Sequence, residues 1–275
     1  MNNQLSIDTF IGGENAFFIT STIISGARDA VLIDAQFTKT DALKLAKKIK
    51  DSGKNLTTVY VTHGHPDHYW GFTVLSEQFP EAQFITAPEV LDVIEETFAA
   101  KIAQWKPVYG EEVPDVPIEP VAYDDDAIDL EGNQLRILHV GQGDVRSSTV
   151  VWIPVLSAIA GGDIAYNGTH VWLAETDNEQ RLKWINNLEH LADMNPKTVI
   201  AGHKQPGSDD EGIHVLLTET RNYITTFNSA ILQSSNAREL IKIMTEKYPD
   251  RALHIILEIA ANNVFPPESK EARAA

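Results

Sequence analysis

The sequence predicts an α/β fold, an αβ/βα sandwich followed by additional C-terminal helices. Two observations carry this prediction. The first and second halves of the chain each alternate β-branched, extended runs with an amphipathic helix, and polar residues cluster directly after several of the predicted strands. The chain has 275 residues, of which 43% are hydrophobic and 22% charged, as expected for a globular protein with a substantial core. We therefore expect functional side chains at strand ends along one edge.

The first half reads as a meander that leads into alternating strands and helices. Gly12-Gly13 and the turn at residues 25–29 separate the early strands. Residues 40–52 carry apolar side chains on a helical period and are followed by Gly53, a stop signal. The strands expected here span residues 5–10, 15–24, 30–33, 57–61 and 83–86. The helices expected here span residues 40–52, 72–79 and 89–104.

The second half repeats this pattern and then becomes helical. Its expected strands span residues 134–140, 149–153, 157–160 and 198–201, and its expected helices span residues 178–192, 215–227, 237–248 and 253–264. We expect residues 1–208 to form the main domain and residues 209–275 to form a helical extension packed on that domain. The last helices would either cover the mouth of a site or form a homodimer face. The charged tail after Pro266-Pro267 is expected to be frayed.

Two segments between the halves lack a regular pattern. Residues 105–120 contain four prolines, at positions 107, 114, 117 and 120, and are interpreted as irregular structure, either a lid over a binding site or a packed connector. The acidic run Asp124-Asp125-Asp126 is most simply a solvated turn.

Composition excludes several classes of partner. Twenty-two basic and 39 acidic residues give a formal charge of −17, which repels phosphate backbones and anionic lipid surfaces, so we expect neither nucleic acid nor membrane as a partner. The chain has no cysteine, which excludes disulfides, thiolate ligands and a cysteine nucleophile. The N-terminal residues lack signal-peptide character and no apolar run reaches membrane-spanning length. A soluble cytoplasmic protein is the expectation.

A dense group of metal-binding side chains follows the predicted strand at residues 57–61. His63, His65, Asp67 and His68 lie within six residues. His63 and His65 point to the same side of an extended segment, and Pro66 fixes the turn that returns Asp67 and His68. Imidazoles with a carboxylate suit Zn²⁺, with Fe²⁺ or Mn²⁺ as alternatives. The other interpretation is a solvated polar turn.

This His-x-His-x-Asp-His spacing resembles the metallo-β-lactamase-fold hydrolases. The resemblance runs from about residue 15 to 206 and includes Gly161-Gly162-Asp163 and Ala201-Gly202-His203. It implies that His63 and His65 hold a first metal, that Asp67, His68 and His203 hold a second, and that Asp163 bridges both. Two zinc ions are the implied cofactor. Asp34 follows a strand where the family often keeps an acidic residue, but a turn or helix-capping role is equally expected.

The chain departs from the family at Gln142, where the resemblance implies a histidine ligand of the first metal. A glutamine amide is a neutral, weaker and harder donor than imidazole. The first site is therefore expected to bind loosely with Gln142 as ligand, to prefer a harder ion, or to take Asp144 or His139 as a substitute. An empty first site is the minority expectation.

The implied activity is hydrolysis of a small-molecule lactone, lactam or ester by a metal-bound hydroxide, with lactone as the leading choice. Asp67 would move a proton to the leaving group. Tyr166 lies three residues after Asp163, the offset of a tyrosine in the related quorum-quenching lactonases, and would either contact the substrate carbonyl or pack on the next helix. His170 and Trp172 would line a pocket or merely pack. The alternatives are an iron-dependent oxidoreductase of the persulfide dioxygenase type, a thioester hydrolase and a metal-poor, non-catalytic binding protein.

Overall fold

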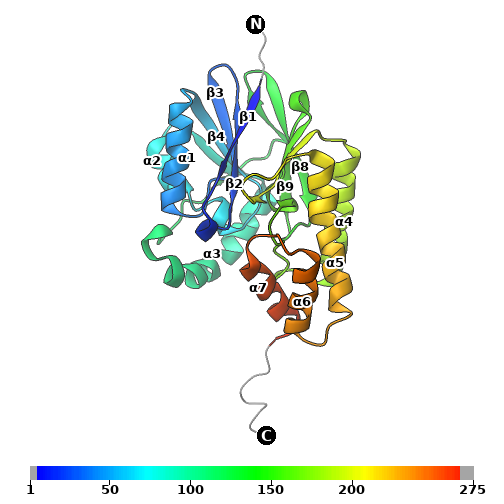
Figure 1. Cartoon of the computed structure of the whole chain (residues 1–275). Helices are drawn as coiled ribbons and strands as arrows, with labels where there is room; N and C mark the ends of the chain where they lie inside the picture. Colours follow the sequence, from blue (N-terminus) through cyan, green and yellow to red (C-terminus); the bar gives the residue numbers. More distant parts are fainter. Residues whose placement is uncertain (1–4, 267–275) are drawn as a thin grey trace.

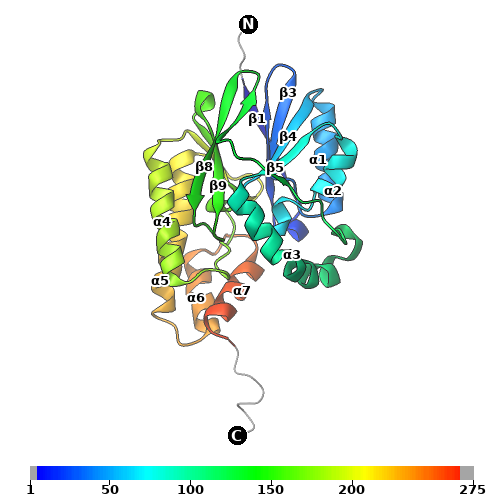
Figure 2. The same ribbon diagram turned by 180° about the vertical axis from the view of Figure 1, so that it is seen from behind.

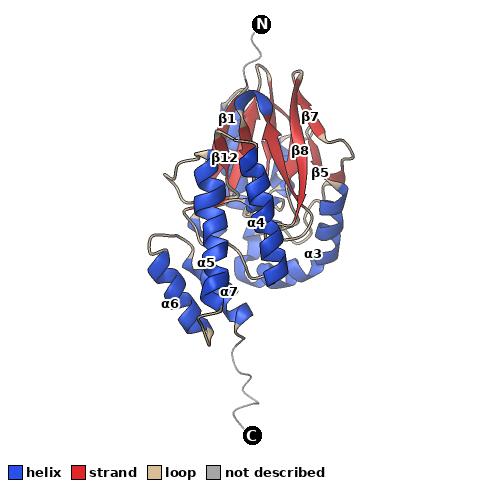
Figure 3. Cartoon of the chain, turned by 90° about the vertical axis from the view of Figure 1, so that its right-hand side faces the viewer, coloured by secondary structure: helices blue, strands red, loops and turns tan. Residues whose placement is uncertain are grey.

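Two β-sheets pack face to face and helices cover the outer face of each (Figure 1). The computed structural model describes residues 5–266, so the predicted frayed tail lies outside the described residues. Helices α1 and α2 lie outside the first sheet, whereas α4 and α5 lie outside the second (Figures 1, 2 and 3). This arrangement confirms the predicted α/β sandwich.

The first sheet has six strands in the order β1-β2-β3-β4-β5-β6. The first three strands pair antiparallel, and β3 to β6 pair parallel, which places the carboxyl ends of β3, β4 and β5 at one edge. Its strands are β1 (Ser6–Ile11), β2 (Thr20–Ser25), β3 (Asp29–Ile33), β4 (Asn55–Val61), β5 (Gln83–Thr86) and β6 (Val121–Ala122). Its helices are α1 (Lys39–Asp51), α2 (Phe72–Gln78) and α3 (Pro88–Tyr109).

The second sheet has five strands in the order β12-β10-β9-β8-β7, and a short parallel pair, β11 and β13, lies beyond it. Its strands are β7 (Ala127–Leu130), β8 (Asn133–Gly141), β9 (Ser148–Ile153), β10 (Ala158–Ala160) and β12 (Thr198–Ile200), with β11 (Tyr166–Asn167) and β13 (His203–Lys204) forming the short pair. Its helices are α4 (Asn178–Asp193), α5 (Asn222–Ile231), α6 (Ala237–Lys247) and α7 (His254–Val264).

Alternating apolar residues on facing strands form the layer between the sheets. Val31, Ile33 and Tyr60 of the first sheet share this cluster with Ile137 and Val151 of the second. Burying each aliphatic side chain contributes about 1.5–3 kcal/mol, so this layer holds the halves together. A separate cluster joins the second sheet to α4 and the C-terminal helices.

Most predicted elements occur within a few residues of their expected bounds, but the segment at 15–24 is not one strand. Glu14–Ala16 forms a 3-10 helix, and Phe17 and Phe18 have φ of 57° and 52°, so the strand begins only at Thr20. The left-handed backbone at these two residues breaks the extended run and turns the chain across the edge of the sheet.

Helix α3 is longer than predicted and includes Pro107. The prediction that residues 105–120 are irregular is therefore wrong for the first five of them. The rings of Trp105 and Tyr109 pack edge-on against Phe37, with centroids 5.8 and 4.7 Å away. This aromatic packing stabilises the last turns although proline removes a helical hydrogen bond.

The predicted helix at residues 215–227 begins as a π-helix, His214–Arg221, and continues as α5. Such wide turns are rare and often lie near functional sites. None of the helices within residues 5–266 is long and apolar enough to cross a membrane.

Candidate metal centre

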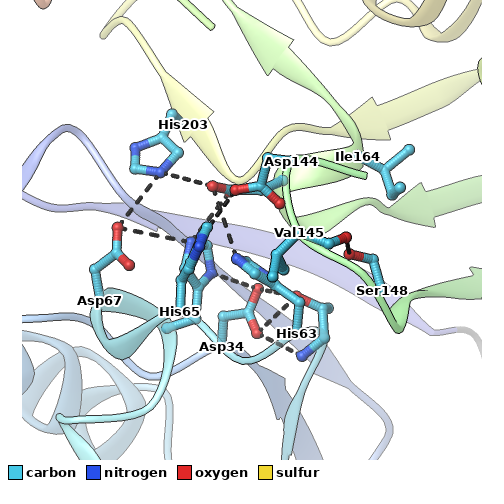
Figure 4. A network of polar contacts seen from close by, with 12 residues as sticks. Asp34, His63, His65, Asp67, Asp144, Val145, Ser148, Ile164 and His203 are labelled. Atoms are coloured by element: carbon cyan, nitrogen blue, oxygen red, sulfur yellow. Dashed lines mark hydrogen bonds and ion pairs between the residues drawn. The ribbon is translucent and has the colours of Figure 1, made fainter. Parts of the chain in front are cut away.

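The histidine motif lies at the carboxyl end of β4, as the sequence predicts. After Val61 the chain turns through His63 and His65 into the 3-10 helix Pro66–His68. Thr62 anchors this turn from both sides, because its backbone N–H donates to Asp34 Oδ1 at 2.9 Å and its carbonyl accepts from the N–H of Thr149 in the second sheet. The motif is therefore held between the sheets (Figure 4).

Four buried side chains form the first ligand group: His63, His65, Asp144 and Asp163. Each offers one atom, and these atoms lie within 4.8 Å of one another. Their exposed fractions are 1%, 6%, 0% and 3%. His65 Nδ1 lies 2.8 Å from Asp144 Oδ2, so imidazole and carboxylate face a common point.

Asp67, His68 and His203 form the second ligand group. His203 Nε2 lies 3.5 Å from Asp67 Oδ2, and His68 Nε2 lies 4.0 Å from the same oxygen. The Asp67 side chain is 17% exposed, whereas His68 and His203 are buried. The second group is therefore the more open of the two.

Asp163 lies between the two groups. One of its oxygens is 3.1 Å from His68 Nε2, and the other is 3.1 Å from His203 Nε2 and 3.8 Å from His63 Nε2. Gly202 permits this position, because a Cβ there would lie 2.0 Å from Asp163 Oδ1. The carboxylate of Asp163 therefore faces donor atoms of both groups.

Three histidines are held so that Nε2 points into the centre. Asp34 accepts both the Thr62 hydroxyl and the Nδ1–H of His68, each at 2.9 Å. Because that hydroxyl is already donating, His63 Nδ1 donates to Thr62 Oγ1 at 3.0 Å. His203 Nδ1 donates to the carbonyl of Phe17 at 2.6 Å. Because Nδ1 of each ring is held by an acceptor, Nε2 is the nitrogen that each ring directs at the centre.

The unpaired polar atoms fit a metal. His63 Nε2 and Asp144 Oδ1 are buried without a hydrogen-bond partner among the described residues, and His68 Nε2 and Asp163 Oδ1 lie 3.1 Å apart without a well-aligned hydrogen bond. Leaving a buried polar atom unpaired costs about 1–3 kcal/mol, and these atoms belong to a donor set of imidazole nitrogens and carboxylate oxygens. That donor set suits Zn²⁺, Fe²⁺ or Mn²⁺.

The surroundings keep one ligand histidine neutral and favour a bound proton on the His65–Asp144 pair. Burial, followed by the neighbouring His68, holds the pKa of His63 well below its ordinary value, so this imidazole stays neutral. Burial also disfavours charged His65, but Asp144 outweighs it and raises the pKa of His65 to about 10. Burial raises the pKa of Asp144 to about 6. A cation in the first group must therefore displace a proton from the His65–Asp144 pair.

Comparison with known proteins agrees with this geometry. The sequence profile of the metallo-beta-lactamase superfamily matches residues 14–203. The chain belongs to this superfamily.

The individual relatives are distant. The type 2 metallo-beta-lactamases of Bacillus sp. (strain 170) and Bacillus cereus are each 22% identical to the chain, covering 78% of it and 79% of their own length. A metallo-beta-lactamase family protein from Thermus thermophilus has a TM-score of 0.65 at 18% identity, covering 94% of this chain and 91% of its own. A beta-lactamase domain protein from Burkholderia ambifaria has a TM-score of 0.66 at 14% identity, covering 94% and 85%. These structures share the fold.

At the position where the chain departs from the superfamily pattern, the structure places Asp144, one of the two expected substitutes for Gln142, with His63 and His65. The Gln142 amide instead donates to the carbonyl of Gly143 at 2.9 Å, because β8 ends in a bulge and Gly141 adopts φ of 80°. His139, the other predicted substitute, pairs with Glu89 and Asp126 at the surface.

Tyr166 lies at the centre but is fully buried. Its hydroxyl donates to Asp163 Oδ2 at 2.7 Å, and its ring stacks on His203 at 5.2 Å between centroids. Thr220 of the π-helix holds the Tyr166 backbone, because the Thr220 hydroxyl lies 3.0 Å from the Tyr166 N–H and 3.1 Å from its carbonyl. Tyr166 is therefore placed to orient the shared carboxylate.

Two residues at the centre have no firm role in the sequence prediction. Asp34 is equally well explained there as a turn or cap, although its position directly after β3 is a signal. Glu175 has no local signal. Its carboxylate lies 3.4 Å from His65 Nε2 and 2.6 Å from Lys101 Nζ.

A pocket opens directly onto both ligand groups. Its empty space is about 450 Å³, including the part open to solvent. Apolar side chains form most of its wall: Phe17, Phe37, Trp105, Trp172 and Ile256. The remaining lining residues include His65, Asp67, Asp163, His203, Lys101 and Glu175. His170 does not line it and instead contacts the Tyr223 hydroxyl at 2.7 Å.

Proposed function

We propose that this protein is a metal-dependent hydrolase that opens an uncharged small-molecule substrate with an apolar body, a lactone before a lactam or an ester. The observation that carries the proposal is an apolar pocket that ends at two groups of metal-binding residues. A carbonyl compound with an apolar substituent can bury that substituent against the aromatic wall while its reactive carbon faces the ligands.

His63, His65, Asp144 and Asp163 would hold one divalent cation, and Asp67, His68 and His203 would hold a second that shares Asp163. The chemistry that such cations supply is Lewis-acid polarisation of a carbonyl and activation of water. The two carboxylates of the first group favour Mn²⁺ or Fe²⁺ as competitors of Zn²⁺ there.

Among the chain's own groups, Asp67 is suited to moving a proton. It lines the pocket and keeps 17% of its side chain exposed, so it can reach both water and the leaving group of a bound substrate. Trp105 and Trp172 exclude water from one side of the reacting carbonyl. Tyr166 orients Asp163 through its hydroxyl.

The charges around the pocket disfavour anionic substrates. Among the described residues that line it, Lys101 is the one lysine or arginine, and its ammonium is already paired with Glu175 at 2.6 Å. A substrate that needs a free cation to anchor a carboxylate, such as a penicillin or a peptide thioester, lacks that anchor here.

The test is a substrate panel with metal-reconstituted protein. We expect kcat/KM for γ-lactones to rise with side-chain length, by up to about fourfold per methylene, since a buried CH₂ is worth about 0.8 kcal/mol. Carboxylate-bearing β-lactams and peptide thioesters should be poorer substrates. Preference for either of them would overturn the proposal, and the absence of turnover from fully loaded protein would instead support a non-catalytic binding protein.

The carboxylate of Asp144 supports one alternative, an iron-dependent oxidoreductase of the persulfide dioxygenase type. Two imidazoles with two carboxylates form a harder donor set than three imidazoles with one carboxylate. Protein loaded with Fe²⁺ would then consume oxygen in the presence of a persulfide, and would leave lactones intact.

A further inference from the structure

We propose that Glu175 is a positioning residue that fixes the ring orientation and tautomer of His65, and that Lys101 of helix α3 holds Glu175 in place. This inference rests on the metal centre of the proposed function, but not on the reaction that the centre performs.

His65 is the one histidine of the two ligand groups whose second nitrogen faces a carboxylate that lines the pocket. The rings of His63, His68 and His203 are held by Thr62, by Asp34 and by a backbone carbonyl. His65 instead directs Nδ1 toward Asp144 at 2.8 Å and Nε2 toward Glu175 Oε2 at 3.4 Å.

This geometry fixes which ring nitrogen of His65 is available to a metal ion. A carboxylate oxygen can only accept, so His65 Nε2 must carry the proton that faces Glu175. By the same argument Nδ1, 2.8 Å from the Asp144 carboxylate, carries a proton in the metal-free protein, and loss of that proton to an incoming cation leaves the Nδ1 lone pair directed into the first ligand group. A carboxylate behind a ligand imidazole fixes the ring and raises its basicity, and removing such a partner weakens metal binding about 10- to 100-fold.

The pairing of Glu175 with Lys101 is more sheltered than a surface ion pair. The Lys101 side chain is 12% exposed and that of Glu175 34%. The Lys183 and Glu179 side chains, which pair at 2.8 Å, are 60% and 76% exposed. Glu175 and Lys101 also share the pocket wall with His65, so their placement serves the site.

The contacts from Lys101 through Glu175 to His65 join helix α3 to the first ligand group. Lys101 lies one helical turn before Trp105, the aromatic residue of α3 that lines the pocket. From there the chain of contacts passes through Glu175 to His65 and ends in the first group. The inference therefore predicts an asymmetric effect on metal binding.

The experiment is a titration of metal-free protein with Zn²⁺ or Co²⁺ against a competing chelator at constant pH. Asp144→Ala identifies the binding step of the first group, because that step should disappear. Glu175→Ala should weaken the same step about 10- to 100-fold and leave the other unchanged. Glu175→Gln, which keeps an acceptor oxygen but loses the charge, should weaken it less, and Lys101→Met should have the smallest effect.

Glu179→Ala is the matched control, since it removes an exposed glutamate from an ion pair of similar length, and both steps should match the wild type. Long-range ¹H–¹⁵N spectra of the Zn²⁺-loaded protein give an independent readout, in which the Nε2 proton of His65 should exchange slowly with solvent in the wild type and clearly faster in Glu175→Ala.

Unchanged binding in Glu175→Ala, or equal weakening of both steps, would overturn the inference. If the wild type binds two metals in this pattern but hydrolyses no member of the substrate panel, the proposed function fails while this inference stands.

Discussion

The two ligand groups share Asp163 but differ in depth and in their surroundings. His63, His65 and Asp144 of the first group are almost fully buried, and Glu175 stands behind His65. In the second group the Asp67 side chain is 17% exposed and lines the pocket. The first group is thus the more enclosed of the two, and the second presents the Asp67 carboxylate to the pocket.

The difference in burial between the two groups indicates where a ligand residue can change without altering the fold. The second group holds the three residues that the resemblance implies for it. In the first group Asp144 lies 2.8 Å from His65, whereas the resemblance implies a histidine at position 142. The change of ligand type thus falls in the buried group, whereas the residue that lines the pocket is the expected Asp67.

The largest effect is expected from Asp67→Asn, which removes a ligand charge and the proton-moving group together. Turnover should fall on the order of 10²- to 10⁴-fold, the range for loss of general acid–base catalysis. The first-group metal should remain, as elemental analysis would show. Wild-type turnover in this variant would break the assignment of chemistry to the second group.

Asp144→Ala should remove the first-group metal, weakening its affinity by more than about a hundredfold, because even residues behind the ligands contribute 10- to 100-fold. Gln142→Ala is the matched control and should leave both metals bound, since its amide contacts Gly143. Metal content after gel filtration checks both variants. Loss of metal from the Gln142 variant would restore glutamine as a ligand.

Tyr166→Phe tests the carboxylate shared by both groups. The hydroxyl bond to Asp163 should be worth about 1.5–3 kcal/mol, as for hydrogen bonds to charged groups, so both metal-binding steps should weaken by up to roughly ten- to a hundredfold. Turnover of all substrates should fall together. A loss confined to lactones, with metal affinity unchanged, would instead place the hydroxyl on the substrate carbonyl.

The smallest expected effect concerns His170, a histidine outside both groups. Burial, Arg251 and His254 lower the pKa of His170 to about 3, so the folded state keeps it neutral. The unfolded chain takes up a proton below about pH 6.5, and stability therefore falls as the pH drops from about 6.5 toward 3. Between pH 7 and 5 this loss is up to about 2 kcal/mol.

Urea unfolding of metal-free wild type and His170→Asn at pH 7 and 5 measures this contribution as the difference between the two proteins. The variant should lose less stability on acidification. Identical pH dependence in both proteins would show that His170 is not kept neutral by the fold.

The motif of His63, His65, Asp67 and His68 was predictable because all four residues lie on one turn after a β-branched strand. Their closeness in space follows from their closeness in sequence. Asp163 and His203 could be placed through the superfamily resemblance, and the structure brings both to the centre.

Asp144 and Glu175 could not be assigned in the same way. The bulge in β8 and the left-handed Gly141 shift the spacing, so the residue that enters the first group lies two positions after the expected one. Glu175 reaches His65 from 110 residues away, and such a contact depends on packing that no local pattern records. The end of α3 was missed for a similar reason, since aromatic packing on Phe37 outweighs Pro107.

Because His214–Arg221 form a π-helix, we expect the segment of the gene that encodes them to be sensitive to the deletion of a single codon. In an α-helix each residue turns about 100°, so deletion of a single codon in this segment would let the wide turns relax to α-helical geometry and rotate everything before the deletion relative to everything after it. Thr220 contacts Tyr166, and Tyr166 contacts Asp163. We expect such a deletion to lower metal affinity in a titration although no ligand is altered, whereas codon losses in the exposed loop at residues 124–126 should leave it unchanged.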